Sequence, residues 1–234
     1  MLKEEVRNHW EKETCGTRYG SAENRRLYFD EMSAARYTLE PYIQAFADFP
    51  AGTGRSVLEI GVGAGADFLN WCIHAEHATG VDLTQAAIDL TRERLILNSV
   101  PPSGYSLLVA DAEDLPFDDG VFDVVYSWGA LHHTPDTERS VAEAFRVLRP
   151  GGTIKVDGLS RAVLDRSLSI PQIRPSPGAS SCVTQRADWS ASGKPWYQGL
   201  PTSRDRRAIT PSRLLWHLSV HTARAQRSAP RGAQ

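Results

Sequence analysis

The chain has 234 residues, of which 41% are hydrophobic and 23% charged, and its formal net charge is −2. These values are typical of a soluble, cytoplasmic globular protein with one full domain. No apolar run approaches the roughly 18 residues of a membrane span, and the charged N-terminal stretch lacks the apolar core of a secretory signal. Three widely spaced cysteines without a paired pattern predict reduced thiols, which argues against a disulfide framework and a zinc site.

Charge is distributed unevenly along the chain. Residues 1–157 carry 14 Lys and Arg against 25 Asp and Glu, whereas residues 158–234 carry 12 basic residues against 3 Asp. The second segment contains neither Glu nor Phe, and seven of its residues are proline. We therefore predict three parts: a helical N-terminal part over residues 1–50, a core domain over 51–157, and an atypical Arg-, Ser- and Pro-rich tail over 158–234.

The N-terminal part is predicted to be helical on both sides of a loop. Residues 3–13 have short helical character, and residues 22–49 repeat apolar side chains at the three-to-four spacing of one or two helices. Glycines in residues 15–20 indicate a loop between these helices.

From residue 55 the pattern changes to short strands that alternate with helices. Strands are predicted over residues 56–60, 77–82, 105–110, 121–127 and 153–156. Helices are predicted over residues 67–74 and 136–148, with a third that Thr84 caps and whose apolar face includes Ile96. Residues 149–152 are expected to end the last helix. Such alternation predicts an α/β fold with a doubly wound, mostly parallel sheet.

The stretch 56–67 reads as a buried strand, a glycine-rich turn and the start of a helix. A strand that ends in such a turn is where open α/β sheets bind nucleotides. Acidic residues mark the same edge: Glu59 precedes the glycines, and Asp82 and Asp111 end the next two strands. A carboxylate at Asp82 suits the vicinal hydroxyls of a ribose, and Asp111 can accept a hydrogen bond from an adenine amino group.

Five motifs occur in the order seen in one enzyme family. They are residues 57–65, 80–84, 110–117, 122–127 and 147–152. In this set the chain resembles class I S-adenosylmethionine-dependent methyltransferases, in the branch of the quinone and sterol methyltransferases. The resemblance implies a Rossmann-like methyltransferase fold with an N-terminal helical lid, S-adenosyl-L-methionine as cofactor, a small-molecule methyl acceptor and no metal.

The resemblance also implies a set of cofactor-binding residues. Gly61 and Gly63 would face the methionine part, Glu59 would order the loop or meet the cofactor amino group, and the backbone of Ser127 would lie near the methionine moiety. The full predicted set is Glu59, Gly61, Val62, Gly63, Asp82, Leu83, Asp111, Ala112 and Ser127.

Candidates on the acceptor side lie in two loops. Trp128 follows the fourth strand, where relatives line the substrate pocket, and His132 or His133 could act as a general base. The alternative is that one histidine caps the next helix while the other packs. Arg18 and Tyr19 are candidates for a lid contact with cofactor or substrate, or belong to a merely structural loop.

Two other functions remain open on the sequence. Residues 61–66 also satisfy a loose dinucleotide fingerprint, with Asp82 at the right distance, so an NAD(P)-dependent oxidoreductase is the first alternative. A nucleic-acid-binding protein that uses the basic tail is the second. Scattered Arg among Ser and Pro, without interleaved aromatic residues, is less typical of such an interface.

The tail shows no strand pair with alternating apolar positions, and its only plausible helix lies around residues 211–220. One hypothesis is a reading-frame artefact that begins soon after Val156; the alternative is a divergent, partly disordered extension. Under the first hypothesis the fifth strand becomes an exposed edge. The protein would then be less stable and could be inactive despite a complete cofactor site.

Overall fold

The computed structural model describes residues 3–158, 174–175 and 221–226. The N-terminal part is helical, as predicted, with two 3₁₀ turns among its helices. Its elements are α1 (Lys3–Lys12), η1 (Thr17–Tyr19), α2 (Arg25–Leu39), α3 (Ile43–Ala47) and η2 (Phe49–Gly52).

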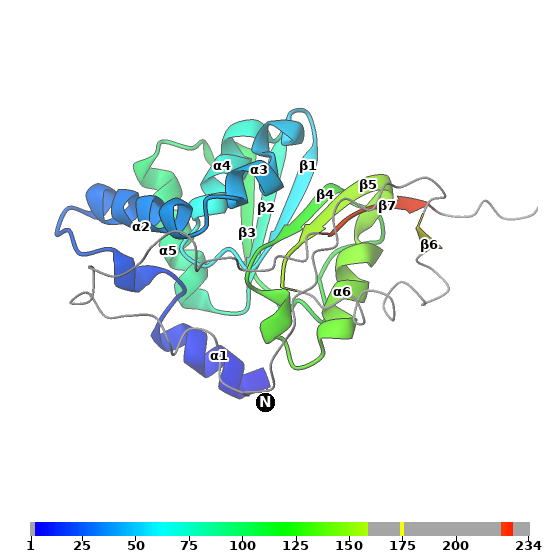
Figure 1. The fold of residues 1–234 in the computed structure, drawn as a ribbon, viewed down its shortest axis with the longest axis horizontal. Helices are drawn as coiled ribbons and strands as arrows, with labels where there is room; N and C mark the ends of the chain where they lie inside the picture. Colours follow the sequence, from blue (N-terminus) through cyan, green and yellow to red (C-terminus); the bar gives the residue numbers. More distant parts are fainter. Residues whose placement is uncertain (1–2, 159–173, 176–220, 227–234) are drawn as a thin grey trace, which may run out of the picture.

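Beyond residue 55, strands and helices alternate and build a twisted sheet (Figure 1). The strands are β1 (Ser56–Ile60), β2 (His77–Asp82), β3 (Tyr105–Val109), β4 (Phe122–Ser127), β5 (Leu148–Val156), β6 (Arg174–Pro175) and β7 (His221–Gln226). The helices between them are α4 (Ala66–His74), α5 (Gln85–Leu97), η3 (Pro102–Gly104), η4 (Leu131–His133) and α6 (Thr137–Arg146). The sheet order is β3-β2-β1-β4-β5-β7-β6, and β1 to β5 pair in parallel. The predicted doubly wound, mostly parallel sheet is confirmed.

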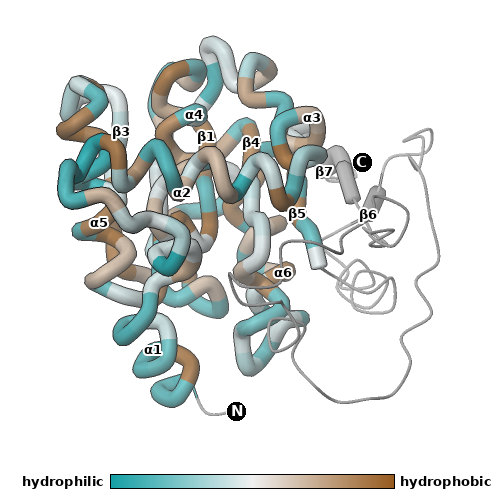
Figure 2. Tube along the Cα trace, turned by 60° about the vertical axis from the view of Figure 1, so that its left-hand side comes forward, coloured by the Kyte–Doolittle hydropathy of each residue, from teal (hydrophilic) through white to brown (hydrophobic). Residues whose placement is uncertain are grey.

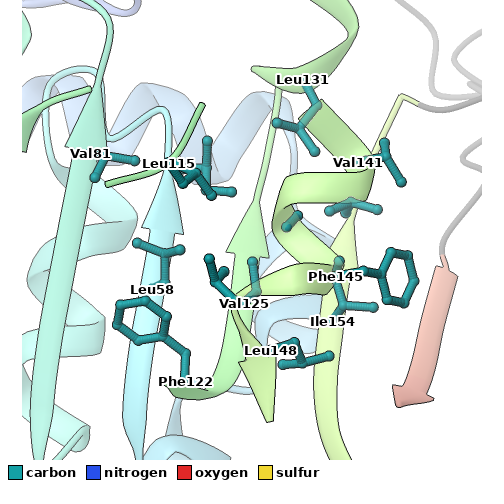
Figure 3. Close-up of a cluster of buried hydrophobic side chains, with 14 residues drawn as sticks. Leu58, Val81, Leu115, Phe122, Val125, Leu131, Val141, Phe145, Leu148 and Ile154 are labelled. Carbon is teal, nitrogen blue, oxygen red and sulfur yellow. The ribbon is translucent and has the colours of Figure 1, made fainter. Parts of the chain in front are cut away.

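Each face of the sheet has its own hydrophobic core, because successive strand residues point to opposite sides. Leu58 and Val125 pack with α6 on one face, in the cluster that Figure 3 shows. Their neighbours Val57 and Val124 pack on the other face with Trp71 of α4. Burial on both faces explains why the central strands read as almost continuous apolar runs.

Two local predictions were wrong. The stretch 149–152 was expected to end α6, but β5 already begins at Leu148. The β4–β5 register shifts from the pair Phe122–Leu148 to the pair Val124–Thr153. Residues 149–152 therefore form an irregularity within β5, opposite a single step of β4. Ile96 was expected on the buried face of α5 but is 65% exposed, because it lies one residue beyond the buried Leu95.

The carboxyl side of β5 also differs from the expectation. The tail was expected to supply no strand, which would leave β5 at the edge of the sheet. Instead β7 pairs with β5 in antiparallel register, from Thr153–Arg224 to Val156–His221, and β6 pairs with β7. The predicted helix near residues 211–220 and the reading-frame hypothesis lie outside the described residues. Among the helices of the described part, none is long and apolar enough to cross a membrane.

Candidate functional site

The glycine turn after β1 has a backbone that only glycine adopts easily. Gly61, Gly63 and Gly65 all have positive φ angles, of 84°, 52° and 73°. A Cβ atom on Gly61 would lie 2.3 Å from Cβ of Ala130, in the loop after β4. The turn is therefore fixed from in front by that loop, and substitution at Gly61 meets both strain and a collision.

Helix α5 holds the turn from behind. The Thr91 hydroxyl donates to the carbonyl oxygen of Gly63 at 3.0 Å, and Arg94 Nε donates to the carbonyl oxygen of Ala64 at 2.6 Å. Thr91 and Arg94 are both buried. Two buried side chains from one helix thus fix consecutive carbonyl groups, which gives the turn a rigid support.

Asp82, at the end of β2, ties the turn to the next helix. Its Oδ2 atom accepts from the amide of Gly63 at 3.0 Å, and its Oδ1 atom accepts from the amide and the hydroxyl of Thr84 at 3.0 and 2.8 Å. Burial raises the pKa of Asp82, against the lowering effect of these donors. Both oxygens of Asp82 therefore already accept bonds from the protein, and the Leu83 amide also acts on this carboxyl group.

Glu59 is the first of two buried acids beneath the turn. It is 4% exposed, and its Oε2 atom has no hydrogen-bond partner among the described residues. Burial raises the pKa of Glu59 well above its usual range, and the nearby Asp67 carboxylate raises it further. An unpaired buried oxygen costs on the order of 1–3 kcal/mol, which a ligand donor such as an amine would offset.

Asp67, in the first turn of α4, is the second buried acid and is fully paired. It accepts from Arg36 Nε and Nη2 at 3.0 and 2.5 Å, from the Tyr37 hydroxyl at 3.0 Å and from the Tyr126 hydroxyl at 2.8 Å. Burial alone would raise the pKa of Asp67, but the Arg36 charge and these bonds hold it below its usual value. The two neighbouring acids thus have pKa values shifted in opposite directions, upward for Glu59 and downward for Asp67.

Cys15, in the loop before η1, lies directly over the glycine turn. A Cβ atom on Gly63 would lie 3.8 Å from Cβ of Cys15. The Cys15 side chain is exposed to solvent, yet surrounding protein raises the pKa of its thiol by desolvation, with Arg36, Glu40 and Asp82 among the nearby charges. Cys15 therefore belongs to the surface that faces Gly63.

Helix α1 crosses the carboxyl edge of the strands, beside the loops after β3 and β4 (Figure 1). Lys3 Nζ lies 2.5 Å from Asp111 Oδ2 and 2.8 Å from Glu113 Oε2. The two carboxylates raise the pKa of Lys3. The side chain predicted to meet adenine is therefore paired with α1, while its Oδ1 atom accepts from the amide of Glu113 at 2.9 Å.

Two further contacts hold α1 in this position. Glu11 accepts from the amides of Gln85 and Ala86, at 3.1 and 3.2 Å, at the start of α5. Trp10 packs edge-on against His133, with ring centroids 5.4 Å apart. The contacts of α1 thus reach the loops after β2, β3 and β4, which is the arrangement expected of a lid.

The loop after β4 contains the remaining predicted residues. The Ser127 hydroxyl donates to the carbonyl oxygen of Ile60 at 2.9 Å, so its side chain joins β4 to β1. Trp128 is 7% exposed, and its indole nitrogen donates to Glu40 at 3.3 Å. The rings of His132 and His133 lie 4.1 Å apart. Burial lowers the pKa of His132 to about 4, and it lowers that of His133 as well.

The lid candidates Arg18 and Tyr19 contact each other. Arg18 Nη2 donates to the Tyr19 hydroxyl at 2.9 Å, and the guanidinium carbon lies 4.9 Å from the ring centroid. Val62 is buried, and Leu83 and Ala112 are partly buried beside Asp82 and Asp111. All predicted cofactor residues therefore lie along one edge of the sheet. A lid from the N-terminal part was expected, but Lys3 and Arg36 were not among the predicted residues, because they carry no local sequence signal for this edge.

The donor set fits a nucleoside with an amino-acid part. Asp82 ends the strand beside the glycine turn and binds its Gly63 amide, and Glu59 presents an orphaned buried oxygen that an amine could meet. Within residues 3–158, no group of three His, Cys, Asp or Glu side chains lies close enough to hold a metal ion.

Comparison with known proteins agrees with this geometry. The chain is 46% identical over 101 residues to the phthiotriol/phenolphthiotriol dimycocerosates methyltransferase of Mycobacterium tuberculosis, covering 42% of this chain and 36% of that enzyme. It is 32% identical over 133 residues to the 27-O-demethylrifamycin SV methyltransferase of Amycolatopsis mediterranei, covering 54% and 47%. The chain thus spans less than half the length of these relatives.

A solved structure shares the fold. The geranyl diphosphate C-methyltransferase of Streptomyces coelicolor aligns with a TM-score of 0.56 and 18% identity, over 74% of this chain and 80% of that one. At the level of sequence families, residues 58–156 match the family described as Methyltransferase domain. Residues 58–156 of this chain are therefore similar to a methyltransferase domain.

Proposed function

We propose that the protein transfers a methyl group from S-adenosyl-L-methionine to a small-molecule acceptor. The observation that carries the proposal is the unpaired, buried Oε2 atom of Glu59 beneath the glycine turn. Asp82, at the end of β2, lies at the same edge of the sheet and binds the turn. A buried acceptor without a donor and an acid at the end of β2 match the amino and ribose groups of that cofactor. The named relatives, which are methyltransferases, support the same reaction.

In this proposal the chain's residues bind and orient rather than react. Asp82 holds the ribose hydroxyls, Glu59 accepts from the amino group, and Asp111 with the amide of Ala112 holds the adenine. The cofactor supplies a methyl group that its sulfonium has already activated. What the protein adds is alignment of an acceptor and exclusion of water, for which α1 provides a cover.

Asp111 has a second partner, which refines its role. Lys3 already occupies its Oδ2 atom, so α1 must shift, or Lys3 must share the carboxylate, when adenine binds. Because α1 contacts a residue of the proposed cofactor site, we assign residues 1–50 to a lid and residues 51–157 to the cofactor-binding core. We also place the protein in the cytoplasm, because its described cysteines are free thiols.

Calorimetric titration of the full chain with S-adenosylmethionine, S-adenosylhomocysteine and NAD tests the proposal. We expect micromolar binding of the first two ligands and none of NAD, the cofactor of the oxidoreductase alternative. Asp82→Asn should weaken binding about tenfold or more, since the charged acceptor of the ribose is lost. Asp89→Asn, an exposed acid of α5, is the matched control and should bind as the wild type does. Binding of NAD alone would refute the proposal.

The acceptor is to be found by transfer of radiolabelled methyl to panels of quinols, sterols and phenols. Because the relatives include a phthiotriol/phenolphthiotriol dimycocerosates methyltransferase and a 27-O-demethylrifamycin SV methyltransferase, these two substrates join the panels. The loop after β4 and the lid would set the choice among acceptors. Nucleic acid is included in the screen as a negative control for the basic tail, of which the structure describes residue 158 and the strands β6 and β7.

A further inference from the structure

A cavity of about 230 Å³ lies on the face of the sheet that α4 covers. Its lining includes Val124 of β4 and the register partner of that residue, Thr153 of β5. Arg55, directly before β1, and Asp48, directly after α3, line it from the side of the N-terminal part. The cavity therefore lies toward the amino ends of the strands, whereas the glycine turn follows the carboxyl end of β1. Figure 1 shows α3 and α1 at opposite ends of the strands accordingly.

Lys155 of β5 is the buried charge in the lining of this cavity. The residue is 9% exposed, and its Nζ atom donates to the carbonyl oxygen of Ala47, the last residue of α3, at 2.7 Å. An ammonium group has three donors, so this bond leaves two for other acceptors. The charge of Asp48 acts on Lys155, but the two side chains form no ion pair in the part of the chain that the structure describes. A buried charge without a partner is costly, so an anion beside Lys155 would be favourable.

Arg55 adds a second cation at the open side of the cavity. Its main chain is fixed, because its amide donates to the carbonyl oxygen of Gly52 and its own carbonyl oxygen accepts from the amide of Glu76, both at 3.0 Å. Its side chain is exposed and pairs with no acid among the described residues. Burial lowers the pKa of Lys155, and the charge of Arg55 lowers it further, against the opposite effect of Asp48. The two cations thus repel each other, and an anion between them would offset that repulsion.

The lining is suited to a small organic anion with one negative charge. Two cations and the acid Asp48 leave one net positive charge, so a dianion would place excess negative charge near Asp48. The Arg55 guanidinium has paired donors that match the two oxygens of a carboxylate. Trp71 and Val124 are 1% and 2% exposed and give the cavity an apolar wall. Because a cavity of about 150 Å³ holds benzene, this volume has room for one ring with a carboxylate.

We propose that this cavity binds a small monocarboxylate of about the size of benzoate. The carboxylate lies between Lys155 and Arg55, and the apolar body of the ligand packs against Trp71. The site is separate from the edge at which the methyl donor is proposed to bind, so this inference does not rest on the proposed function.

Saturation-transfer NMR and calorimetry of the full chain with benzoate test the inference. Benzamide has nearly the same shape without the charge, and inorganic phosphate carries more charge without the ring. At constant ionic strength we expect about millimolar or tighter binding of benzoate, and at least about tenfold weaker binding of the other two probes. S-adenosylmethionine at saturation should leave the Kd of benzoate unchanged, because the two sites lie at different ends of the strands.

Two variants connect the binding to this cavity. Arg55→Gln changes an exposed side chain without a partner in the described part, so it should fold normally and weaken benzoate about tenfold, with little effect on benzamide. Lys155→Met keeps a side chain of similar length and should remove the preference for benzoate over benzamide; a thermal melt shows whether it is folded. Arg92→Gln, at an exposed arginine of α5, is the matched control and should bind benzoate as the wild type does.

Several results would overturn the inference. Equal binding of benzoate and benzamide would remove the role of the charge, and tighter binding of phosphate would contradict the ligand class. Displacement of benzoate by S-adenosylmethionine, or an unchanged Kd in Arg55→Gln, would place the ligand elsewhere. Absence of benzoate binding at tens of millimolar would refute the site itself.

Discussion

The ion pair between Arg36 and Asp67 is the contact whose loss should cost the fold most. Arg36→Met removes two of the four donors to Asp67, at 3.0 and 2.5 Å, together with their positive charge. The Asp67 side chain is 1% exposed and that of Arg36 24%, so water cannot replace the lost partner. Breaking a buried pair on one side costs about 3–5 kcal/mol.

This magnitude is readily measurable. Each kcal/mol shifts the melting temperature of a chain of this size by about 2–4 °C, so we expect a fall of roughly 6–20 °C. The remaining bonds from Tyr37 and Tyr126 place the expected cost toward the lower end. Chemical denaturation at pH 7 gives the free energy of unfolding directly. Arg92→Met, which removes an exposed pair with Asp89 on α5, is the control and should cost under about 1 kcal/mol.

The effect should depend on pH in a defined direction. In the wild type the pKa of Asp67 is lowered, so its contribution to stability is present above the unfolded pKa and is lost as the pH falls through the folded value. Without Arg36, burial raises the pKa of Asp67. At acid pH the carboxyl group of the variant is neutral, so the variant does not bear the free-energy cost of a buried, unpaired charge. The difference between the two proteins should therefore shrink below about pH 4. A cost as small as that of Arg92→Met, or one independent of pH, would refute this account of the network.

Three further outcomes follow from single contacts. Gly61→Ala should destabilise the protein more than Gly129→Ala in thermal melts, because both glycines have positive φ but only the first added Cβ collides, at 2.3 Å; equal losses would contradict that. Thr84→Ala removes the cap of α5 and should cost about 0.5–2 kcal/mol in chemical denaturation, whereas no loss would show that the cap is replaced. Lys3→Gln should leave the melting temperature nearly unchanged, since the Lys3 side chain is 41% exposed. The same change should tighten adenosine binding at low salt, because it frees the Asp111 carboxylate. Weaker binding would indicate that Lys3 supports the site.

The elements that the sequence predicted well are those with a local physical cause. The strand 56–60 and the Thr84 cap are confirmed, because a buried apolar run and a capping hydroxyl act within a few residues. The start of β5 was missed, since Pro150 and two glycines look like the end of a helix unless the β4 register is known. The partner of β5 was missed as well, because β7 is neither apolar nor alternating in sequence.

The same division applies to the candidate site. Glycine turns and acidic residues at strand ends can be predicted from the sequence, because their spacing follows from the α/β repeat. Contacts from the N-terminal part are not: Arg36 meets Asp67 across 31 residues, and Lys3 meets Asp111 across 108. Such pairs depend on how the helices pack over the sheet. The division of the chain at residues 50 and 157, and the role of each site residue, stay predictions.

The N-terminal part joins the core in two very different ways, and this difference bears on how a ligand enters. Helix α2 is fixed by the buried pair of Arg36 with Asp67, which connects it to the floor of the glycine turn. Helix α1 is largely hydrophilic (Figure 2), and Val6 is its one buried residue. Lys3 and Glu11, which make polar contacts from this helix, have side chains open to water, although Lys3 also pairs with the buried Glu113.

Exposed ion pairs contribute little, whereas a buried one is expensive to break. Opening the site by moving α1 therefore costs far less than moving α2, and the lowest-energy opening leaves Arg36, Asp67 and the glycine turn in place. Among the described residues it is α1 that covers Asp111, so the adenine end of the proposed site is the end that opens. On the acceptor side, Trp128 keeps its packing against Phe46 of α3, so that side stays rigid while the ligand enters.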